Sequence, residues 1–388
     1  MREPAAVTGA GPLTREAVPA ARSLRVRGAA VLYRLHDVGY EIQLDRALEL
    51  LSSSAPERAR PSRAEAQAIE ILTPPVSVSL GPERLFVGGR ALDAVVSARI
   101  FHFGVVSLRV RVTAPAEMTW EEFTAFGNAV QAADSAALFS AHLQALAARI
   151  ASATERPFLA PLTEDYIMFR VNGLRVAGGE ISAADALRHV DVAPLLLNES
   201  RPLSRAAREE MLPHRFSYYA DDLAILTWEN ALVVDPSTAE ETDVEYVLEF
   251  ANAQLLELRY YDAILDAELP RIYDRVTEHR AGRYFRRFTQ LLADLQTLVA
   301  DSTETVERAE NALKVTDDVY LARIYTAALE IFRARAWRAG IDRKLAIIRE
   351  TYEMLNAQAQ AVRSELLEAT IVVLIVLEII LALAGVVG

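Results

Sequence analysis

The chain has 388 residues, a formal net charge of −12 and no cysteine. This length accommodates two or three domains, each with its own hydrophobic core. The lack of cysteine excludes disulfides, thiolate catalysis and cysteine-ligated zinc. The acidity argues against a non-specific nucleic-acid binder, which needs a basic face. Arginines between Arg271 and Arg287 form a local exception, which fits either a basic patch or a solvated helix face.

The first part of the chain mixes strand and helix patterns. Residues 1–22 are rich in Ala, Pro, Gly and Arg without a regular period, and we expect a disordered leader there. Thr119 followed by Glu122 has the spacing of a capping box and predicts a helix that continues to about Ser152. Alternating apolar residues predict strands or strand pairs at Leu24–Leu35, Val76–Val87, Ala94–Phe103, Val105–Val112, Asp165–Val176 and Leu223–Val234. We therefore predict an α+β fold for a head domain over residues 23–236.

After Pro236 the strand signals end and helical periods take over. Apolar residues spaced three and four apart form one stripe from Val244 to Leu269, which we expect to end near Pro270. A heptad seam follows between Phe285 and Leu313, typical of a coiled coil or helical hairpin. A third stripe begins at Tyr320 and keeps its phase across Gly340, so the helix either continues there or breaks at the glycine. These stripes predict an antiparallel or coiled-coil helical stalk over residues 237–367.

The last segment of the chain, residues 368–388, is predominantly apolar, and Glu378 is the single charged residue between Ala369 and Val387. Such a run is long enough to cross a bilayer as one helix, which predicts a transmembrane anchor and a single-pass, tail-anchored membrane protein. A buried helix of a soluble core is the alternative. Basic residues precede the run and none follows it, so the bulk of the chain is expected in the cytoplasm, or facing the matrix of an organelle.

Glu378 would lie near the centre of the bilayer, where a carboxylate is costly unless it meets a polar partner. We expect a homo-oligomer with Glu378 at the helix contact, and Ala382 and Gly385 on the same face would let the helices approach closely. A protonated glutamate tolerated in lipid is the alternative.

The common catalytic signatures are absent from the sequence. It contains no phosphate-binding loop, no dinucleotide fingerprint and no serine-hydrolase elbow, and its six histidines lack the spacing of paired metal ligands. We therefore predict no cofactor and assign no catalytic residue. The carboxylates of Asp221, Asp222 and Asp235 flank a predicted hairpin and are candidate Mg²⁺ ligands, although acidic residues at strand ends also serve as turn and cap residues.

Several short stretches resemble the required-for-meiotic-nuclear-division (YagE-like) family. They include Phe101–Val106 upstream and Asp342–Leu345 before the last helix. The residues that match its signature are Ser217, Tyr218, Tyr219, Asp221, Asp222, Trp228, Asp235, Pro236, Arg363, Glu365 and Glu368. Ala369 departs from the pattern, because relatives carry tryptophan there. The resemblance implies an inner-membrane or plasma-membrane protein, with eukaryotic relatives linked to mitochondrial translation and meiotic division, and it implies no catalytic residues.

Two functional hypotheses follow. The first is a membrane-tethered scaffold that self-associates through its helices and recruits an unidentified protein partner, and the absence of catalytic motifs favours it. The second is a metal-dependent enzyme that uses the acidic hairpin of Asp221, Asp222 and Asp235.

Overall fold

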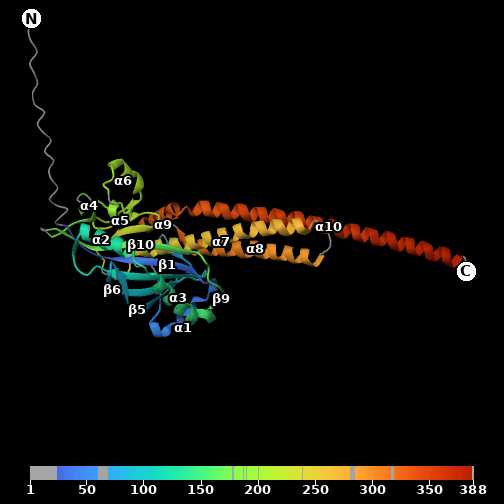
Figure 1. Cartoon of the computed structure of the whole chain (residues 1–388), viewed down its shortest axis with the longest axis horizontal. Helices are drawn as coiled ribbons and strands as arrows, with labels where there is room; N and C mark the ends of the chain where they lie inside the picture. The colour runs from blue at the N-terminus through green and yellow to red at the C-terminus, as the bar shows by residue number, and fades with distance from the viewer. Residues whose placement is uncertain are drawn as a thin grey trace, which may run out of the picture.

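The structure, a computed structural model, describes residues 24–386 except 60–68, 177–178, 187, 189, 200, 238, 280–284 and 316–318. A broad twisted sheet carries helices on both faces, and long helices project from one side of it (Figure 1). The predicted leader, residues 1–22, lies outside the described residues.

The main sheet is mixed, because β10 pairs in parallel with β14 while its other neighbours are antiparallel. Its path is β12 (Arg215–Phe216), β13 (Leu223–Leu226), β14 (Asn230–Val234), β10 (Thr163–Val176), β1 (Arg25–Asp37), β7 (Val105–Thr113), β6 (Arg90–Ile100), β5 (Val76–Val87) and β3 (Glu57–Arg58). Off this path, β11 (Gly179–Glu180) pairs with β10 and β8 (Met118–Thr119) with β1. Two small sheets join β2 (Gly39–Ile42) to β9 (Thr154–Pro157) and β4 (Ile69–Ile71) to β15 (Leu313–Val315).

The two faces of the sheet belong to two hydrophobic cores, because successive side chains of a strand point to opposite faces. On β1, Ala30 and Leu32 join the first core, whereas Val31 and Tyr33 join the second. The first core is covered by α1 (Leu44–Leu50), α2 (Trp120–Gln131), α3 (Ala136–Ile150), α4 (Ala183–Ala186) and α5 (Ala193–Leu196). The second is covered by α7 (Asp243–His279) and α9 (Tyr320–Ile331). A short helix, α6 (Arg205–Met211), follows α5.

A bundle of long helices continues from the second face. The far half of α7 packs with α8 (Phe285–Asn311) and α10 (Ala334–Val386) around a third core that includes Leu265, Leu295 and Ile341. The first half of α7 covers the sheet and its second half joins the bundle. The second core therefore contains residues from both sides of the predicted boundary at residue 236. The predicted division into 23–236, 237–367 and 368–388 stays a prediction.

Three details of the helices differ from the sequence-based expectations. α7 continues through Pro270 instead of ending there, and α2 and α3 replace the single helix predicted from Thr119 to Ser152. α10 is continuous across Gly340, where a Cβ would lie 3.1 Å from Asp262 Oδ1 of α7, so the glycine allows a close approach. The chain breaks instead between α9 and α10, where Arg333 adopts a left-handed conformation with φ of 52°.

Other expectations are confirmed. The capping box of Thr119 and Glu122 is present at the start of α2. The seam phase predicted for α8 is also correct over its described side chains, since Leu295, Val306 and Ala309 are buried while Gln296 is exposed.

The predicted membrane anchor is wrong. Over the residues that the structure describes, no helix is both long and apolar enough to cross a membrane. α10 runs through the predicted anchor, but Glu365, Glu368 and Glu378 lie along its described end, and a span needs about 20 predominantly apolar residues. The predicted architecture with a C-terminal transmembrane helix is therefore replaced by a large mixed sheet with helices. The same finding corrects the prediction of a single-pass, tail-anchored membrane protein and its membrane localisation.

Candidate functional site: an arginine-lined cavity

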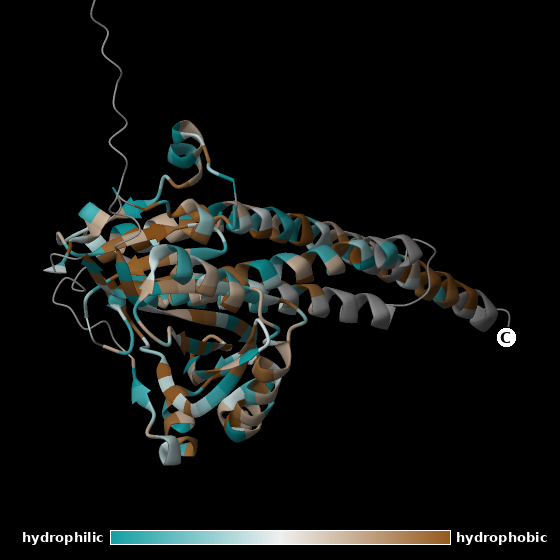
Figure 2. Cartoon of the chain, turned by 60° about the vertical axis from the view of Figure 1, so that its left-hand side comes forward, coloured by the Kyte–Doolittle hydropathy of each residue, from teal (hydrophilic) through white to brown (hydrophobic). Residues whose placement is uncertain are grey.

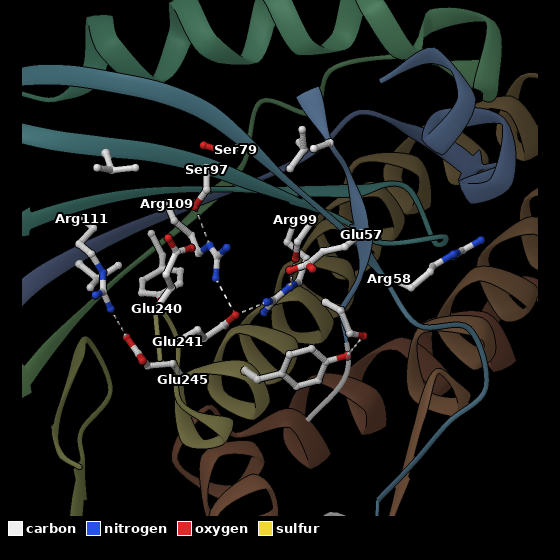
Figure 3. A pocket seen from close by; sticks show the side chains of 18 residues that line it. Glu57, Arg58, Ser79, Ser97, Arg99, Arg109, Arg111, Glu240, Glu241 and Glu245 are labelled. Atoms are coloured by element: carbon white, nitrogen blue, oxygen red, sulfur yellow. Dashed lines mark hydrogen bonds and ion pairs between the residues drawn. The ribbon is translucent and has the colours of Figure 1, made fainter. Parts of the chain in front are cut away.

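A cavity of about 750 Å³ opens between the outer strands of the sheet and the beginning of α7 (Figure 3). Its walls come from β1, β3, β5, β6 and β7 of the sheet, from the first turn of α7 and from the loop that precedes this helix. The polar residues that line it are Glu57, Arg58, Ser77, Ser79, Ser97, Arg99, Arg109, Arg111, Glu240, Glu241 and Glu245, and Tyr33 and Tyr246 contribute aromatic rings.

Strand alternation places the arginines there. On β7, Leu108 and Val110 point into the first core, so Arg109 and Arg111 must point to the other face. On β6, Ser97 lies opposite Arg109 in the antiparallel register, and Arg99 is two residues further along the same face. The pattern of alternating apolar and polar residues was read as strand from the sequence, but the arginines were not singled out.

Carboxylates of α7 and the preceding loop meet these arginines. Glu245 and Glu249 are four residues apart, which places them on one side of the first two turns of α7, and Glu241 lies four residues before Glu245 in the preceding loop. The Glu245 carboxylate accepts a hydrogen bond from the backbone N–H of Thr242 at 2.7 Å, and the Glu245 N–H donates to the Thr242 hydroxyl at 3.1 Å. This capping box fixes the first turn of α7 against the sheet.

The ion pairs form a network of two neighbouring groups, one around Glu241 and Glu249 and one around Glu245. Glu241 Oε2 lies 2.5 Å from Arg99 Nη2 and 2.9 Å from Arg109 Nη1. Arg99 Nη1 also donates to Glu249 Oε2, and both of these side chains are almost fully buried. Glu245 is shared between Arg111 at 3.8 Å and Arg170 at 3.6 Å. Figure 3 shows Arg99 and Arg109 pointing toward Glu241, and Arg111 toward Glu245.

Two serine hydroxyls and the ring of Tyr246 also contact Arg99 and Arg109. The Nε–H of Arg99 donates to Ser77 Oγ at 3.3 Å, and that of Arg109 donates to Ser97 Oγ at 3.1 Å. The Arg99 guanidinium also lies over the Tyr246 ring, 4.5 Å from its centroid. The guanidinium groups are therefore held in fixed orientations, which suits recognition of a planar or tetrahedral anion.

The network separates the pKa values of its carboxyl groups. Burial alone would raise the pKa of Glu241, but Arg109 and Arg99 outweigh it and lower the pKa to about 2. Burial raises the pKa of Glu249 above its usual value in spite of Arg99 and Arg109, and it raises that of Glu245 in spite of Arg170 and Arg111. Burial, followed by Glu245 and Glu249, raises the pKa of Tyr33 well above its usual value. Glu241 is thus the carboxylate of the network that is most firmly ionised.

The acidic hairpin predicted as a metal site has a different structure. Asp222 Oδ1 accepts hydrogen bonds from the N–H groups of Tyr218 and Tyr219 at 2.7 and 3.0 Å, and Asp235 Oδ1 accepts from the Ser237 N–H at 2.8 Å. Asp221 is exposed. Within the described ranges, no group of three His, Cys, Asp or Glu side chains could hold a metal ion. Metal binding by this hairpin stays a prediction that its geometry does not favour.

The other predicted positions are spread over the molecule. The Ser217 hydroxyl donates to the Tyr219 carbonyl, and the half-exposed Trp228 packs edge-on against Phe332 with ring centroids 6.1 Å apart. Pro236, Glu365, Glu368 and Glu378 are exposed. The side chains of Arg363, Ala382 and Gly385 lie outside the described residues.

The described end of α10 is apolar and exposed. Figure 1 shows it extending beyond α7 and α8, and Figure 2 shows its hydrophobic colouring. Its exposed large apolar residues are Leu367, Ile371, Val372, Val373, Leu374, Ile375, Val376, Leu377, Ile379 and Ile380, which are 49–64% exposed.

Comparison with known proteins identifies the family. The family model described as "Uncharacterized protein MJ0711, N-terminal domain" matches residues 27–240, more than half of the chain. The chain belongs to this family. A relative, the uncharacterized protein MJ0711 of Methanocaldococcus jannaschii, is 32% identical over 195 residues, which cover 50% of this chain and 59% of the relative. The chain thus matches less than two thirds of that protein. No solved structure matches the chain.

Membership of the MJ0711 N-terminal domain family corrects the resemblance drawn from the sequence. The assignment to the required-for-meiotic-nuclear-division family was wrong, and its implications for translation and division are withdrawn. The quoted residues from Ser217 to Asp222 form a turn held by local hydrogen bonds, and short turn motifs recur in unrelated proteins because the geometry demands the same residue types.

The match to the MJ0711 N-terminal domain ends at residue 240, so some residues that line the cavity lie inside the matched region and others lie after it. The arginines on β6, β7 and β10 lie inside the matched region. Glu241, Glu245 and Glu249 come directly after it. The charged network therefore joins the family domain to the first turns of the helical bundle.

Proposed function

We propose that the chain is a small-molecule-binding protein whose ligand occupies the arginine-lined cavity. The observation that carries the proposal is a cavity of about 750 Å³ into which Arg99, Arg109 and Arg111 converge. Ligand sites are typically concavities of about 300–1,000 Å³ with a few well-placed polar groups.

The cost of the network supports this proposal. Removing two opposite charges from water often costs more free energy than their attraction returns, so buried ion pairs are a poor means of stabilising a fold. Arg99 and Glu249 are 1% and 0% exposed, and apolar residues would pack at such positions with less cost. A site that must hold charged groups in fixed positions for a ligand accounts for their presence.

Because the chain contains no cysteine, a single introduced cysteine can test whether a ligand occupies the cavity. Ser79 lines the cavity and is exposed, so a Ser79→Cys variant carries one thiol at the cavity wall. Its rate of modification by a thiol reagent is measured alone and with pyrophosphate, glucose 6-phosphate, glucose, AMP or adenosine. At least one compound should slow the modification, because a bound molecule blocks access to the thiol.

The matched control is Ser140→Cys, an exposed position on α3, which covers the opposite face of the sheet. Its modification rate should be the same with and without each compound. If no compound protects Ser79→Cys, or if every protecting compound protects Ser140→Cys equally, the proposed function is wrong.

We propose a second role, self-association through α10, because its described end leaves large apolar side chains exposed. Burying each such side chain stabilises an assembly by about 1.5–3 kcal/mol. The end of α10 projects beyond the other helices, so the same residues of two copies can meet without a collision of the sheets (Figure 1).

Sedimentation velocity of the intact chain tests this second role. The unmodified chain should form oligomers, and the Ile371→Arg/Leu374→Arg double variant should shift toward the monomer. The Glu365→Gln/Glu368→Gln variant, altered at exposed polar positions of the same helix, should keep the oligomer. A chain that remains monomeric at every concentration would disprove self-association.

A further inference from the structure

Glu241 differs from the other two carboxylates of the network in its position. It lies on the loop before α7, outside any helix or strand, and its side chain is 23% exposed, whereas Glu245 and Glu249 lie inside α7 at 1% and 0%. A loop residue at the edge of a cavity can move without breaking helical hydrogen bonds.

One of the two carboxylate oxygens of Glu241 contacts the arginines. Oε2 meets both Arg99 and Arg109, while Oε1 is buried and has no hydrogen-bond partner among the described residues. A buried acceptor without a partner is unfavourable by about 1–3 kcal/mol. The arginines are therefore occupied by a carboxylate that fits them incompletely.

The arginines have a second carboxylate partner besides Glu241. Arg99 keeps its contact with Glu249 when Glu241 leaves, and Arg109 Nη1 lies 3.8 Å from the same Glu249 carboxylate. Among the described residues, Arg111 has one ion pair, the long 3.8 Å contact with Glu245, and its side chain is 28% exposed. Arg109 and Arg111 are two residues apart on one strand, about 6.6 Å along its axis, so one anionic group can contact both.

We propose that Glu241 stands in for an anionic group of the ligand: the cavity binds molecules that carry a phosphate or a carboxylate, and this group displaces Glu241 from Arg109 and Arg99. This inference rests on the proposed small-molecule-binding function and specifies the chemistry of the ligand. The exchange of one anion for another keeps the arginines paired, whereas a neutral molecule would leave two buried guanidinium groups short of a counter-charge.

The bound anion would receive several donors. Guanidinium groups donate in pairs to phosphate and carboxylate oxygens, and the hydroxyl of Ser97 lies beside Arg109. Binding of the anion is therefore coupled to a movement of the Glu241 side chain out of the cavity, while Arg170 still donates to the backbone carbonyls of Ser237 and Glu240 and holds the loop.

Titration calorimetry on the intact chain tests the displacement. Pyrophosphate and citrate are the probes for a phosphate and a carboxylate ligand, and each is measured with the unmodified chain and with Glu241→Gln. Glu241→Gln should bind at least one probe tenfold or more tightly, because the probe no longer competes with a tethered carboxylate. The matched control is Glu350→Gln, at an exposed position on α10 remote from the cavity, and it should bind as the unmodified chain does.

Two further variants keep the test decisive. Glu241→Gln combined with Arg111→Gln should lose the gain in affinity, which locates the anion at the arginines. Glu241→Asp keeps the charge but shortens the side chain, and it should give an intermediate affinity. If Glu241→Gln unfolds at the assay temperature, the rise in melting temperature caused by pyrophosphate is compared between Glu241→Asp and the unmodified chain, and it should be larger for Glu241→Asp.

The possible failures are distinguishable. Equal affinity of Glu241→Gln and the unmodified chain for both probes would overturn the inference. Protection of Ser79→Cys by glucose to the same degree as by glucose 6-phosphate would also overturn it, while leaving the cavity as a binding site. If no compound protects Ser79→Cys, the proposed function fails as well.

Discussion

Arg99 donates a hydrogen bond to Glu249 although the two residues are 150 positions apart and both side chains are almost completely removed from solvent. Arg99 belongs to β6 of the sheet and Glu249 to the second turn of α7. The pair therefore ties the start of the helical bundle to the sheet at the floor of the cavity.

Removal of Arg99 should strongly destabilise the fold. Arg99→Met leaves Glu249 buried without its closest cation, which costs about 3–5 kcal/mol in the free energy of unfolding. The double variant Arg99→Met/Glu249→Leu should recover much of this loss, because both charges are removed together. Urea denaturation measures all three chains. Arg205→Ala, at an exposed ion pair with Glu209, serves as the control and should leave the midpoint unchanged; a loss below about 1 kcal/mol for Arg99→Met would contradict the buried pair.

Glu241 should contribute a stability that depends on acidic pH. Its pKa is about 2 in the folded chain and about 4.5 when unfolded, so the unfolded state binds the proton more readily. The contribution, of the order of 3 kcal/mol, is complete above about pH 5 and is lost as the pH falls from about 4.5 to about 2. Glu241→Gln should therefore be less stable than the unmodified chain at pH 7, and this difference should shrink at pH 3. Thermal unfolding at both pH values measures it, and a difference independent of pH would disprove the assignment.

Asp37 should show the opposite dependence. Burial raises its pKa from 3.8 to about 8, although the hydrogen bond from the Gly39 N–H acts in the opposite direction, and the buried Glu257 of α7 has a raised pKa because of burial and Asp37. A folded state that holds the proton more tightly loses stability as the pH rises from about 4 to about 8, by up to about 1.4 kcal/mol per pH unit. Asp37→Asn cannot ionise, so its stability should fall less over this range. Equal slopes for Asp37→Asn and the unmodified chain would show that Asp37 does not titrate there.

The buried face of α8 predicts that a substitution at Leu295 lowers the melting temperature much more than one at the neighbouring Gln296. Leu295 is 3% exposed in the third core, so Leu295→Asp buries a carboxylate without a partner and should lower the melting temperature by many degrees. Gln296 is exposed, so Gln296→Asp should change the melting temperature little. Similar losses for both variants would mean that α8 packs in another phase.

Much of the strand and helix pattern follows from local sequence, whereas the cavity does not. The turn at Gly88–Gly89, the hairpin of β13 and β14 and the capping box at Thr119 are each encoded within a few residues. The alternation of Arg109 and Arg111 with apolar residues identifies a strand, but it also describes a strand with one face in water.

The charged network depends on which segments meet in the folded chain. Arg99 and Arg109 become a buried site only because Glu241 and Glu249, some 140 residues later, are brought over them by α7. A sequence periodicity specifies the face of one element, not its partner. The signal that could have identified the site was the recurrence of glutamate every four residues, at Glu241, Glu245 and Glu249, beside a helix start.

Gly104 provides a final test of the packing beside Asp37. Its φ is +96°, a conformation that L-residues rarely adopt, and a Cβ there would lie 1.8 Å from the Gly39 carbonyl oxygen and 3.3 Å from Asp37 Oδ1. Gly104→Ala must therefore separate the β2 strand from the turn between β6 and β7, and it should destabilise the chain by several kcal/mol. Gly88 also has a positive φ, 55°, but a Cβ there meets nothing within 4 Å, so Gly88→Ala carries the backbone strain without the collision. Denaturation midpoints should drop much further for Gly104→Ala than for Gly88→Ala, and comparable drops would mean that strain alone, and not the contact with Gly39, requires the glycine.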